Sequence, residues 1–320
     1  MEKNDIKVSV CVVTYNQKDY ISECIESIIS QEANFKYEVI IGDDCSTDGT
    51  RDLIVSYQKK YPDLIRPILR KENVGVVRNL AELYMSARGD YIAHIDGDDV
   101  MMPNKLATQF EILESNLDCY ICSHDMVKIN SISETVGYSK KVSLPNNISL
   151  PDLYRNLPFF AHSSKMFRND LSDHEFYKYL DKDTADFELH LYHANKGDIY
   201  HIPEHLGKYR VGVGVSIGEH RINPILPMRK SVLFEALLKD KMVNMENNEI
   251  KVIYSQCMCN YAKGSFYFGN ISDFKKYILK SKNISVFSFE QIIYLVLSMF
   301  PSKVILFFRM LFLKLTKNNN

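Results

Sequence analysis

A group of carboxylates in this sequence stands where the side chains can share a cation. Residues 91–95 form a short apolar run typical of a strand, and Asp96, Asp98 and Asp99 follow it around Gly97. Carboxylates set this close repel one another and lose hydration, and a shared cation relieves both costs. A hard divalent ion such as Mg²⁺ takes oxygen ligands and keeps open positions for phosphate oxygens. We therefore predict a metal and diphosphate site at Asp96 and Asp98, at the carboxyl end of a strand.

Two other interpretations apply to this acidic stretch. Asp-Gly-Asp is also ordinary turn chemistry, so a purely structural turn is the alternative. An EF-hand loop is excluded, because Val100 and Met101 stand where a calcium loop requires an oxygen ligand and a glycine.

A second apolar run, at residues 37–42, also ends in acidic residues, at Asp43 and Asp44. Two acidic strand ends favour a functional site, although Ser46, Thr47 or Asp48 is also expected to cap the helix that follows.

The surrounding pattern predicts the scaffold that positions these carboxylates. Apolar runs typical of strands alternate with segments of helical periodicity, which indicates a parallel, doubly wound α/β sheet. Right-handed crossovers place the strand ends on one edge, so Thr14, Asp43, Asp44, Asp96 and Asp98 are expected to face one cleft. The predicted strands are 7–14, 37–42, 65–69 and 91–95, and the predicted helices include 20–31, a helix that Pro62 closes, one around 80–87, and 104–114.

Composition limits the class of protein. The 320 residues are 46% hydrophobic, enough for one large domain with an appendage, which we place at 1–218 and 219–320. The formal net charge is -1, so the basic excess of a nucleic-acid-binding protein is missing. The charged N-terminus has no apolar signal region, and the seven scattered cysteines are typical of reduced thiols. These features predict a cytoplasmic protein.

Four segments in order, residues 8–16, 39–48, 72–79 and 87–99, together resemble the family 2 glycosyltransferases of GT-A fold. The likeness continues to Leu106 and returns between residues 186 and 210, so it covers about two-thirds of the chain. It implies a Rossmann-like, mostly parallel sheet flanked by helices, here with a helical C-terminal extension. It also implies a nucleotide-sugar donor, Mg²⁺ or Mn²⁺, and inversion at the anomeric carbon.

The resemblance also implies roles for single residues on the donor side. Thr14 and Tyr15 would line the nucleotide pocket, and Asp44 would accept a hydrogen bond from the uracil ring. Arg78 would lie beside the base or the diphosphate, where an arginine fork matches phosphate oxygens. Asp96 would meet the ribose or the metal.

For the metal itself, the resemblance implies that Asp98 holds the cation that bridges the two phosphates. Asp99 would assist from beside it.

By the same resemblance, Asp186 is the catalytic base that takes a proton from the acceptor hydroxyl. The family often has Glu-Asp at this point, whereas Ala185 precedes Asp186 here. Asp183 and Glu188 therefore remain alternative bases, and a simple helix cap remains the alternative role of Asp186.

A later segment, residues 202–210, resembles the strand and loop that close the donor site. Many relatives place a histidine two residues after the matching arginine, and this chain has Gly212 there, so His205 or His220 would have to substitute. Residues 162–164, His-Ser-Ser, are interpreted as a strand edge on the acceptor side. Glycines that would make the later segment a flexible lid are Gly212, Gly214 and Gly218.

The end of the chain is apolar in two stretches, residues 292–300 and 304–315, separated by Pro301. Neither reaches the roughly 20 apolar residues of a spanning helix. We expect a peripheral membrane contact through residues 289–315, in which Lys303, Arg309 and Lys314 meet anionic headgroups. The alternative is a helix packed on the domain or on a second subunit.

Together these features predict a metal-dependent, inverting glycosyltransferase at the inner face of the cell membrane. It would move a sugar, most simply from a UDP-sugar, to a hydroxyl of a glycan or lipid-linked glycan acceptor, as in polysaccharide biosynthesis. A nucleotidyltransferase is one alternative, but residues 14–21 lack its glycine-rich basic loop. A non-catalytic nucleotide- or sugar-binding module is the other, and the acidic set at Asp44, Asp96, Asp98 and Asp186 argues against it.

Overall fold

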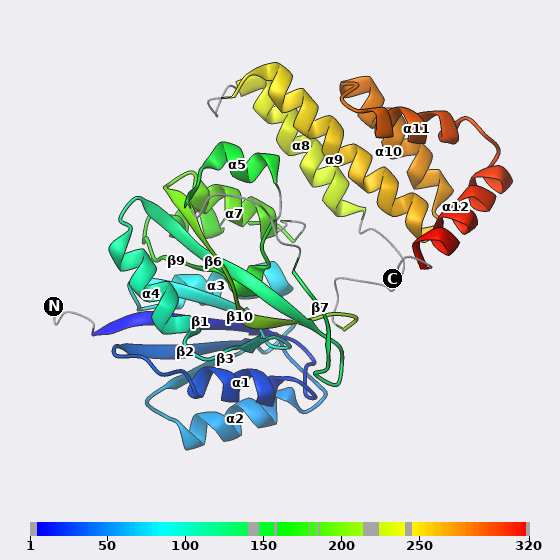
Figure 1. Cartoon of the computed structure of the whole chain (residues 1–320). Coiled ribbons are helices and arrows are strands. Elements are labelled where there is room, and N and C mark those ends of the chain that lie inside the picture. Colours follow the sequence, from blue (N-terminus) through cyan, green and yellow to red (C-terminus); the bar gives the residue numbers. More distant parts are fainter. Residues whose placement is uncertain are drawn as a thin grey trace. The chain divides into compact units, whose positions relative to one another are not determined.

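The computed structural model describes residues 5–139, 147–156, 159–178, 180–182, 184, 186–213, 224–240 and 245–317. It divides into two compact units, Met1–Gly214 and Val215–Asn320 (Figure 1). The domain boundary predicted after residue 218 falls on residues outside the described ranges.

In the described part of the first unit, ten strands form one sheet. The path is β3-β2-β1-β4-β9-β6-β10-β5, with β7 beside β6 and β8 beside β10. The strands are β1 (Ile6–Thr14), β2 (Lys36–Asp43), β3 (Ile65–Leu69), β4 (Tyr91–Asp96), β5 (Val100–Met101), β6 (Cys119–Ile129), β7 (Thr135–Tyr138), β8 (Asn147–Ile148), β9 (Met166–Arg168) and β10 (Asp198–Arg210).

The first half of the sheet is parallel, as predicted. β1 pairs in parallel with β2 and β4, and β2 with β3. The second half is mixed, because β9 runs antiparallel to both β4 and β6, while β6 and β10 are parallel. The α/β class and the GT-A type of sheet are confirmed, and the mixed half is the part that strand periodicity alone did not predict.

The helices of the first unit lie on both faces of the sheet (Figure 1). β1 is buried over its last seven residues, so both of its faces need apolar cover. Helix α1 covers one face with its buried side chains Ile21, Cys24, Ile25 and Ile28. From α3, the Tyr84 ring packs against Phe167 of the sheet. The helices are α1 (Ile21–Ile29), α2 (Thr50–Lys60), α3 (Val76–Ser86), α4 (Lys105–Ser115), α5 (Leu150–Arg155), α6 (Asp173–Lys178) and α7 (Asp186–Ala194).

Two local predictions need correction. Residues His162–Ser164 form a buried 3-10 turn, not a strand edge, because Ser164 N–H and Lys165 N–H close back on the chain at Ala161 and His162. The N-cap of α2 is Gly49 at φ 103°, with no side-chain cap bond. The Asp48 carboxylate instead accepts the Thr50 N–H at 2.9 Å, one residue inside the helix.

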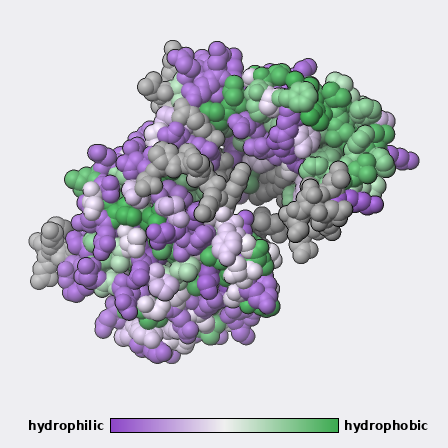
Figure 2. Space-filling model, in the orientation of Figure 1, coloured by the Kyte–Doolittle hydropathy of each residue, from purple (hydrophilic) through white to green (hydrophobic). Residues whose placement is uncertain are grey.

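The second unit is helical in its described part. Its helices are α8 (Ile225–Asp240), α9 (Asn247–Phe268), α10 (Ile271–Ile284), α11 (Phe289–Ser298) and α12 (Ser302–Lys317). Gln291 anchors the start of α11, donating to Ser281 Oγ at 2.8 Å and to the Ser285 carbonyl at 2.9 Å. Figure 2 shows apolar surface gathered over the end of this unit that α11 and α12 form. Among the described residues, the structure contains no helix with the length and apolar character that crossing a membrane requires.

Candidate active site

The three strand ends predicted to meet are hydrogen-bonded side by side. In the sheet register, Thr14 lies opposite Asp43 and Val13 opposite Asp96. Beyond the paired residues, Asp44 N–H donates to the Thr14 carbonyl at 3.0 Å, and Gly97 N–H donates to the Val13 carbonyl at 2.9 Å. The acidic ends of β2 and β4 therefore flank the end of β1 on one sheet edge.

The turn at Gly97 has no room for a side chain. A Cβ atom there would lie 2.5 Å from Gln17 Oε1 and 2.9 Å from Thr14 Oγ1. Thr14 is only 2% exposed, so its side chain lies beneath this turn, whereas Tyr15 is 41% exposed. Of the two residues assigned to the nucleotide pocket, Tyr15 therefore presents the larger surface to a ligand.

Arg210 fixes the residues that follow the turn. Its guanidinium is fully buried and donates from Nε to the Asp98 carbonyl at 2.8 Å. Its backbone N–H donates to Asp99 Oδ1 at 2.8 Å, and Nη2 donates to Glu23 at 2.6 Å. The last residue of β10 thus ties the acidic turn, residues 96–99, to α1. This contact spans more than one hundred residues, and the sequence pattern did not indicate it.

The charges of the acidic turn are poorly compensated within the protein. Burial, and then the charge on Asp96, raises the pKa of Asp98 to about 6. The same two causes raise the pKa of Asp99 well above its usual value. Asp99 Oδ2 is buried and has no hydrogen-bond partner among the residues that the structure describes. A carboxylate set with excess negative charge and an unpaired buried oxygen fits a divalent cation.

The protein side chains supply only part of a cation's coordination shell. Within the described ranges, no group of three or more acidic, histidine or cysteine side chains converges as a metal site. Mg²⁺ is commonly held by one or two carboxylates together with substrate phosphates and water. Asp96 and Asp98 therefore fit a cation that arrives with, or is completed by, a diphosphate.

Asp44 holds the loop before α3. Its two carboxylate oxygens accept Val74 N–H at 2.8 Å and Gly75 N–H at 2.9 Å, and the residue is 3% exposed. Gly75 has φ +88°, a backbone conformation that favours glycine. Each oxygen keeps a further lone pair, so Asp44 is able to accept another N–H only from a ligand that reaches this depth.

Arg78 lies on the exposed side of α3. Its side chain is 69% exposed, and Nε pairs with Glu82 at 3.0 Å. It helps to line a cavity of about 250 Å³. The cavity is formed by residues 74–78 and 180–182, so it adjoins the loop that Asp44 holds.

Asp186 is the first residue of α7, and its side chain is 72% exposed. Desolvation, and then the charge on Asp96, raises the pKa of Asp186 to at most about 6, because solvent reaches a side chain this exposed and weakens both effects. Of the alternative bases, Glu188 lies in the same helical turn, and Asp183, like His220, lies outside the described residues.

Behind these carboxylates lie buried polar side chains whose roles sequence reasoning missed. His94 Nε2 is 3.1 Å from Asp96 Oδ1, and His162 Nδ1 is 3.5 Å from Asp186 Oδ1. Lys105 is 1% exposed and donates to the Ser163 carbonyl at 2.6 Å. The one available signal was a histidine inside the apolar run of β4, directly before the acidic turn.

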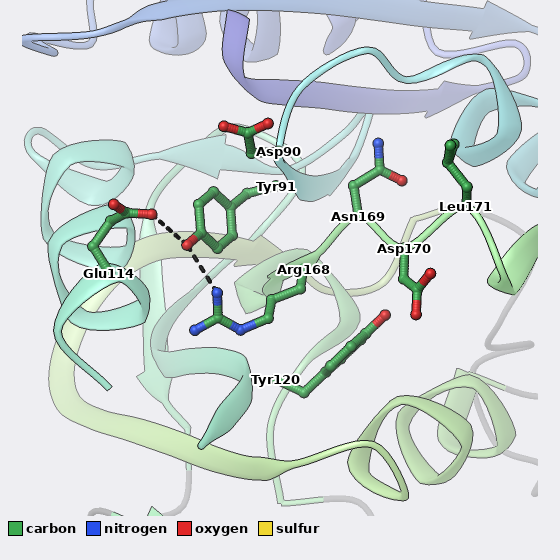
Figure 3. A pocket seen from close by; sticks show the side chains of 8 residues that line it. All are labelled: Asp90, Tyr91, Glu114, Tyr120, Arg168, Asn169, Asp170 and Leu171. Atoms are coloured by element: carbon green, nitrogen blue, oxygen red, sulfur yellow. Dashed lines mark hydrogen bonds between the residues drawn. The ribbon is translucent and has the colours of Figure 1, made fainter. Parts of the chain in front are cut away.

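A larger cavity, about 630 Å³, lies at the start of β4 rather than at its acidic end (Figure 3). Arg168 points into it and would be its natural anion-binding group. However, its guanidinium already donates to the Tyr91 hydroxyl and to the carbonyls of Leu113, Asn116 and Cys119. This cavity therefore lacks a free cation for a phosphate among the described residues.

Comparison with known proteins decides the relationship. Residues 9–176 match the family model described as "Glycosyl transferase family 2". The chain belongs to glycosyl transferase family 2. The matched range includes Thr14, Asp44, Arg78 and the acidic turn of this family 2 chain, and it ends before Asp186.

Individual relatives agree with this assignment. The chain is similar to the putative glycosyltransferase EpsE of Bacillus subtilis, with 41% identity over 51% of this chain and 56% of EpsE. It spans between half and three-fifths of the length of EpsE and of the mycobacterial relatives that it matches. The chain also matches uncharacterized proteins of Mycobacterium tuberculosis and Mycobacterium bovis, with 34% identity.

Solved structures share the fold of this family 2 chain. Staphylococcus aureus TarS 1-349, crystallised in complex with UDP-GlcNAc, superposes with a TM-score of 0.63 at 17% identity, covering 88% of this chain and 84% of that one. The mannosyltransferase PcManGT of Pyrobaculum calidifontis, in complex with GDP-Man and Mn²⁺, gives 0.53 at 18% identity, covering 92% and 79%.

Proposed function

We propose that this family 2 chain transfers a sugar from a nucleotide-sugar donor to a hydroxyl of a glycan or lipid-linked glycan, with inversion at the anomeric carbon. The observation that carries the proposal is a chain of contacts between the two carboxylates. Asp96 lies 3.1 Å from His94, and the rings of His94 and His162 are in contact. His162 in turn lies 3.5 Å from Asp186, which supports a joint action of the α7 carboxylate and the acidic end of β4 on one bound molecule. The acidic end of β4 would serve the donor, and Asp186 would serve the acceptor.

The donor nucleotide would lie along the edge made by β1, β2 and the loop before α3. Tyr15 offers an exposed ring for a base, Asp44 is an acceptor suited to the ring N–H of uracil, and Arg78 is a nearby cation. These residues support a UDP-sugar as the donor. The TarS complex with UDP-GlcNAc, a protein of the same fold, is consistent with that choice.

Asp96 and Asp98 would hold Mg²⁺ or Mn²⁺. When bound there, the ion would stabilise the negative charge of the departing nucleoside diphosphate. The fold neighbour PcManGT was solved with Mn²⁺ and GDP-Man.

Asp186 would act as the general base. Its carboxylate takes the proton of the acceptor hydroxyl as that oxygen forms a bond to the anomeric carbon. The bond from the anomeric carbon to the diphosphate oxygen breaks in the same step, and the electron pair leaves with the nucleoside diphosphate. A single displacement of this kind inverts the anomeric centre, and the 72% exposure of Asp186 leaves the face from which an acceptor would enter open.

A peripheral membrane contact through residues 289–315 is a further part of the proposal. Apolar side chains of α11, of α12 and of the segment between them are exposed, among them Phe289 at 77%, Met299 at 74% and Phe307 at 54%. Residues 302–317 contain lysine and arginine but no acidic residue, which suits an anionic bilayer surface. Exposed Lys303 and Lys314 are free to meet headgroups, whereas Arg309 donates to the Tyr267 carbonyl at 2.8 Å and serves packing as well.

The experiment that tests the proposed function measures release of nucleoside diphosphate from a panel of nucleotide sugars, with Mn²⁺, with Mg²⁺ and with chelator. Asp98→Asn and Asp186→Asn are compared with Asp90→Asn, which removes a carboxylate at the far end of β4 that pairs with Lys7. We expect metal-dependent release from one donor, lost in the first two variants and kept in the control.

Acceptor dependence is examined by adding glycan and lipid-linked acceptors to the same reactions. If no donor turns over under any of these conditions and calorimetry detects neither nucleotide nor metal binding, the transferase proposal is wrong. Donor binding that survives without turnover would instead support the non-catalytic binding module.

A further inference from the structure

Two imidazoles lie between the carboxylates on the donor and acceptor sides. His94, on β4, faces Asp96 through Nε2 at 3.1 Å. His162, in the 3-10 turn, faces Asp186 through Nδ1 at 3.5 Å. The two rings touch edge to face, with centroids 3.9 Å apart and planes at 74°. Both histidines are buried, so this contact fixes the position of each ring.

The tautomer of His162 depends on its hydrogen bond to Tyr84. Its Nε2 lies 2.9 Å from the hydroxyl of Tyr84, a fully buried side chain on α3. If the phenol donates to Nε2, the ring proton of a neutral imidazole is on Nδ1, the atom that faces Asp186. Nδ1 itself is buried and has no hydrogen-bond partner within the described part of the chain. In that tautomer, the Nδ1–H of His162 points toward Asp186, the proposed base.

We propose that His162 is a positioning residue for Asp186. Its Nδ1–H would engage the Asp186 carboxylate when substrate is bound and hold it toward the acceptor hydroxyl. The present separation is 3.5 Å, and a movement of about 0.5 Å would bring it to an ordinary hydrogen-bond length. Catalytic hydrogen bonds are often long before substrate binds and shorten in the complex. The inference rests on the proposed function, because it names the partner of the proposed base.

The surroundings keep His162 neutral, which the role requires. Burial, and then the nearby His94 and Lys165, lowers the pKa of His162 well below its usual value. His190 of α7, with its ring 5.1 Å away, acts in the same direction. A neutral N–H donor orients a carboxylate without giving up its proton, so Asp186 stays free to accept the proton of the substrate.

Other charged groups near the base act through space. Lys165 is fully buried, its Nζ is 3.2 Å from His193 Nδ1, and its charge lowers the pKa of Asp186. Asp96 raises the same pKa. His162 differs from both because it approaches the carboxylate directly and in one direction. Its removal should therefore affect orientation, which neither distant charge supplies.

The test compares two replacements at one position. His162→Phe keeps the ring volume and removes the donor, and His162→Asn places an amide N–H near the position of Nδ1. We expect kcat for sugar transfer to fall about 10- to 100-fold in His162→Phe, with the KM for the donor unchanged. Loss of the donor should also move the acid limb of the kcat/KM profile to higher pH. His162→Asn should restore a measurable part of kcat and move the acid limb back toward its native pH.

His201→Phe is the matched control. It also replaces a buried histidine by phenylalanine, but His201 bonds to Ser123 and faces Asp125 on β6. Its kcat and its pH profile should equal those of the native chain. Thermal unfolding of every variant checks that each is folded, and His162→Asn keeps the test valid if the phenylalanine variant does not fold.

The outcomes separate the two proposals. If the native chain transfers no sugar and binds no nucleotide, the proposed function fails. If the native chain is active and His162→Phe keeps the native kcat and pH profile, only the positioning role is overturned. Equal losses in the phenylalanine and asparagine variants, with an unshifted pH profile, would show that His162 serves packing and would also overturn it.

Discussion

Arg210 donates a hydrogen bond from its fully buried guanidinium to the carbonyl of Asp98, while its own backbone N–H donates to the carboxylate of Asp99. The end of β10 and the acidic turn after β4 therefore form one bonded unit. Arg210 also stacks on the Tyr20 ring, 4.6 Å from its centroid, and pairs with Glu23. Loss of the guanidinium would leave several polar groups without partners at once.

We expect Arg210→Met to lower the free energy of unfolding by about 3 kcal/mol, because it removes a buried guanidinium that donates to the carbonyls of Asp98 and Asn130 and pairs with Glu23. Arg78→Met, at an exposed position with one helical ion pair, should change it by about 0.5 kcal/mol or less. Urea denaturation at neutral pH measures both. A loss for Arg210→Met no larger than that for Arg78→Met would show that the network does not stabilise the turn.

Gly97→Ala should disrupt the acidic turn. The added Cβ meets Gln17 Oε1 at 2.5 Å and Thr14 Oγ1 at 2.9 Å, so the turn or the end of β1 must move. We expect nucleotide affinity in the presence of Mn²⁺ to fall about tenfold or more, measured by calorimetry. Gly137→Ala is the control, since its nearest neighbour is a lysine side-chain carbon at 4.0 Å. Native affinity in both variants would contradict the close packing at Gly97.

The pH dependence of transfer should follow the ionisation of Asp186. The pKa of this group is raised to about 6 by desolvation and by Asp96, and a base works only when deprotonated. We therefore expect kcat/KM to fall about tenfold per pH unit below the pKa and to level off above it. A cation held by Asp96 would offset the negative charge of that residue, so the midpoint of the pH profile should lie at about pH 6 or below. A rate that stays constant down to pH 4 would exclude Asp186 as the base.

Membrane association should depend on the apolar face of α12. We expect the chain to sediment with vesicles of phosphatidylglycerol and phosphatidylcholine, and less with phosphatidylcholine alone. Phe307→Ser with Phe308→Ser should abolish this binding, while Val232→Ser, at a 62% exposed position on α8, should not.

Two results of the vesicle experiment would contradict the membrane contact. One is equal binding of all variants, which would place the contact elsewhere. The other is absence of vesicle binding together with a dimer, seen by sedimentation equilibrium, that the double variant dissociates. That second result would assign the apolar face to another copy of the chain.

The parts of the fold that were predictable are those whose signal is local. β1, β2 and β4 have apolar runs, their carboxyl ends are marked by Thr14, Asp44 and Asp96, and the parallel topology brings these ends together. Asp186 was found through a resemblance that lies beyond the matched family range. Its proposed role remains a prediction.

The remaining features arise from contacts between distant segments. His162 meets Tyr84 across 78 residues, and Arg210 meets Glu23 across 187. No periodicity records such pairs, because each depends on how elements far apart in the sequence pack against one another. Lys105 shows the same limit, since a lysine at the start of a helix normally faces solvent and this one is 1% exposed.

The Asp44 carboxylate has a consequence for engineering. It bonds to the backbone of Val74 and Gly75, and in the proposed function it also reads the donor base. A replacement meant to alter nucleotide choice at this position would at the same time release the loop that leads to Arg78. Redesign of donor preference would therefore succeed more readily at Tyr15, whose side chain is 41% exposed.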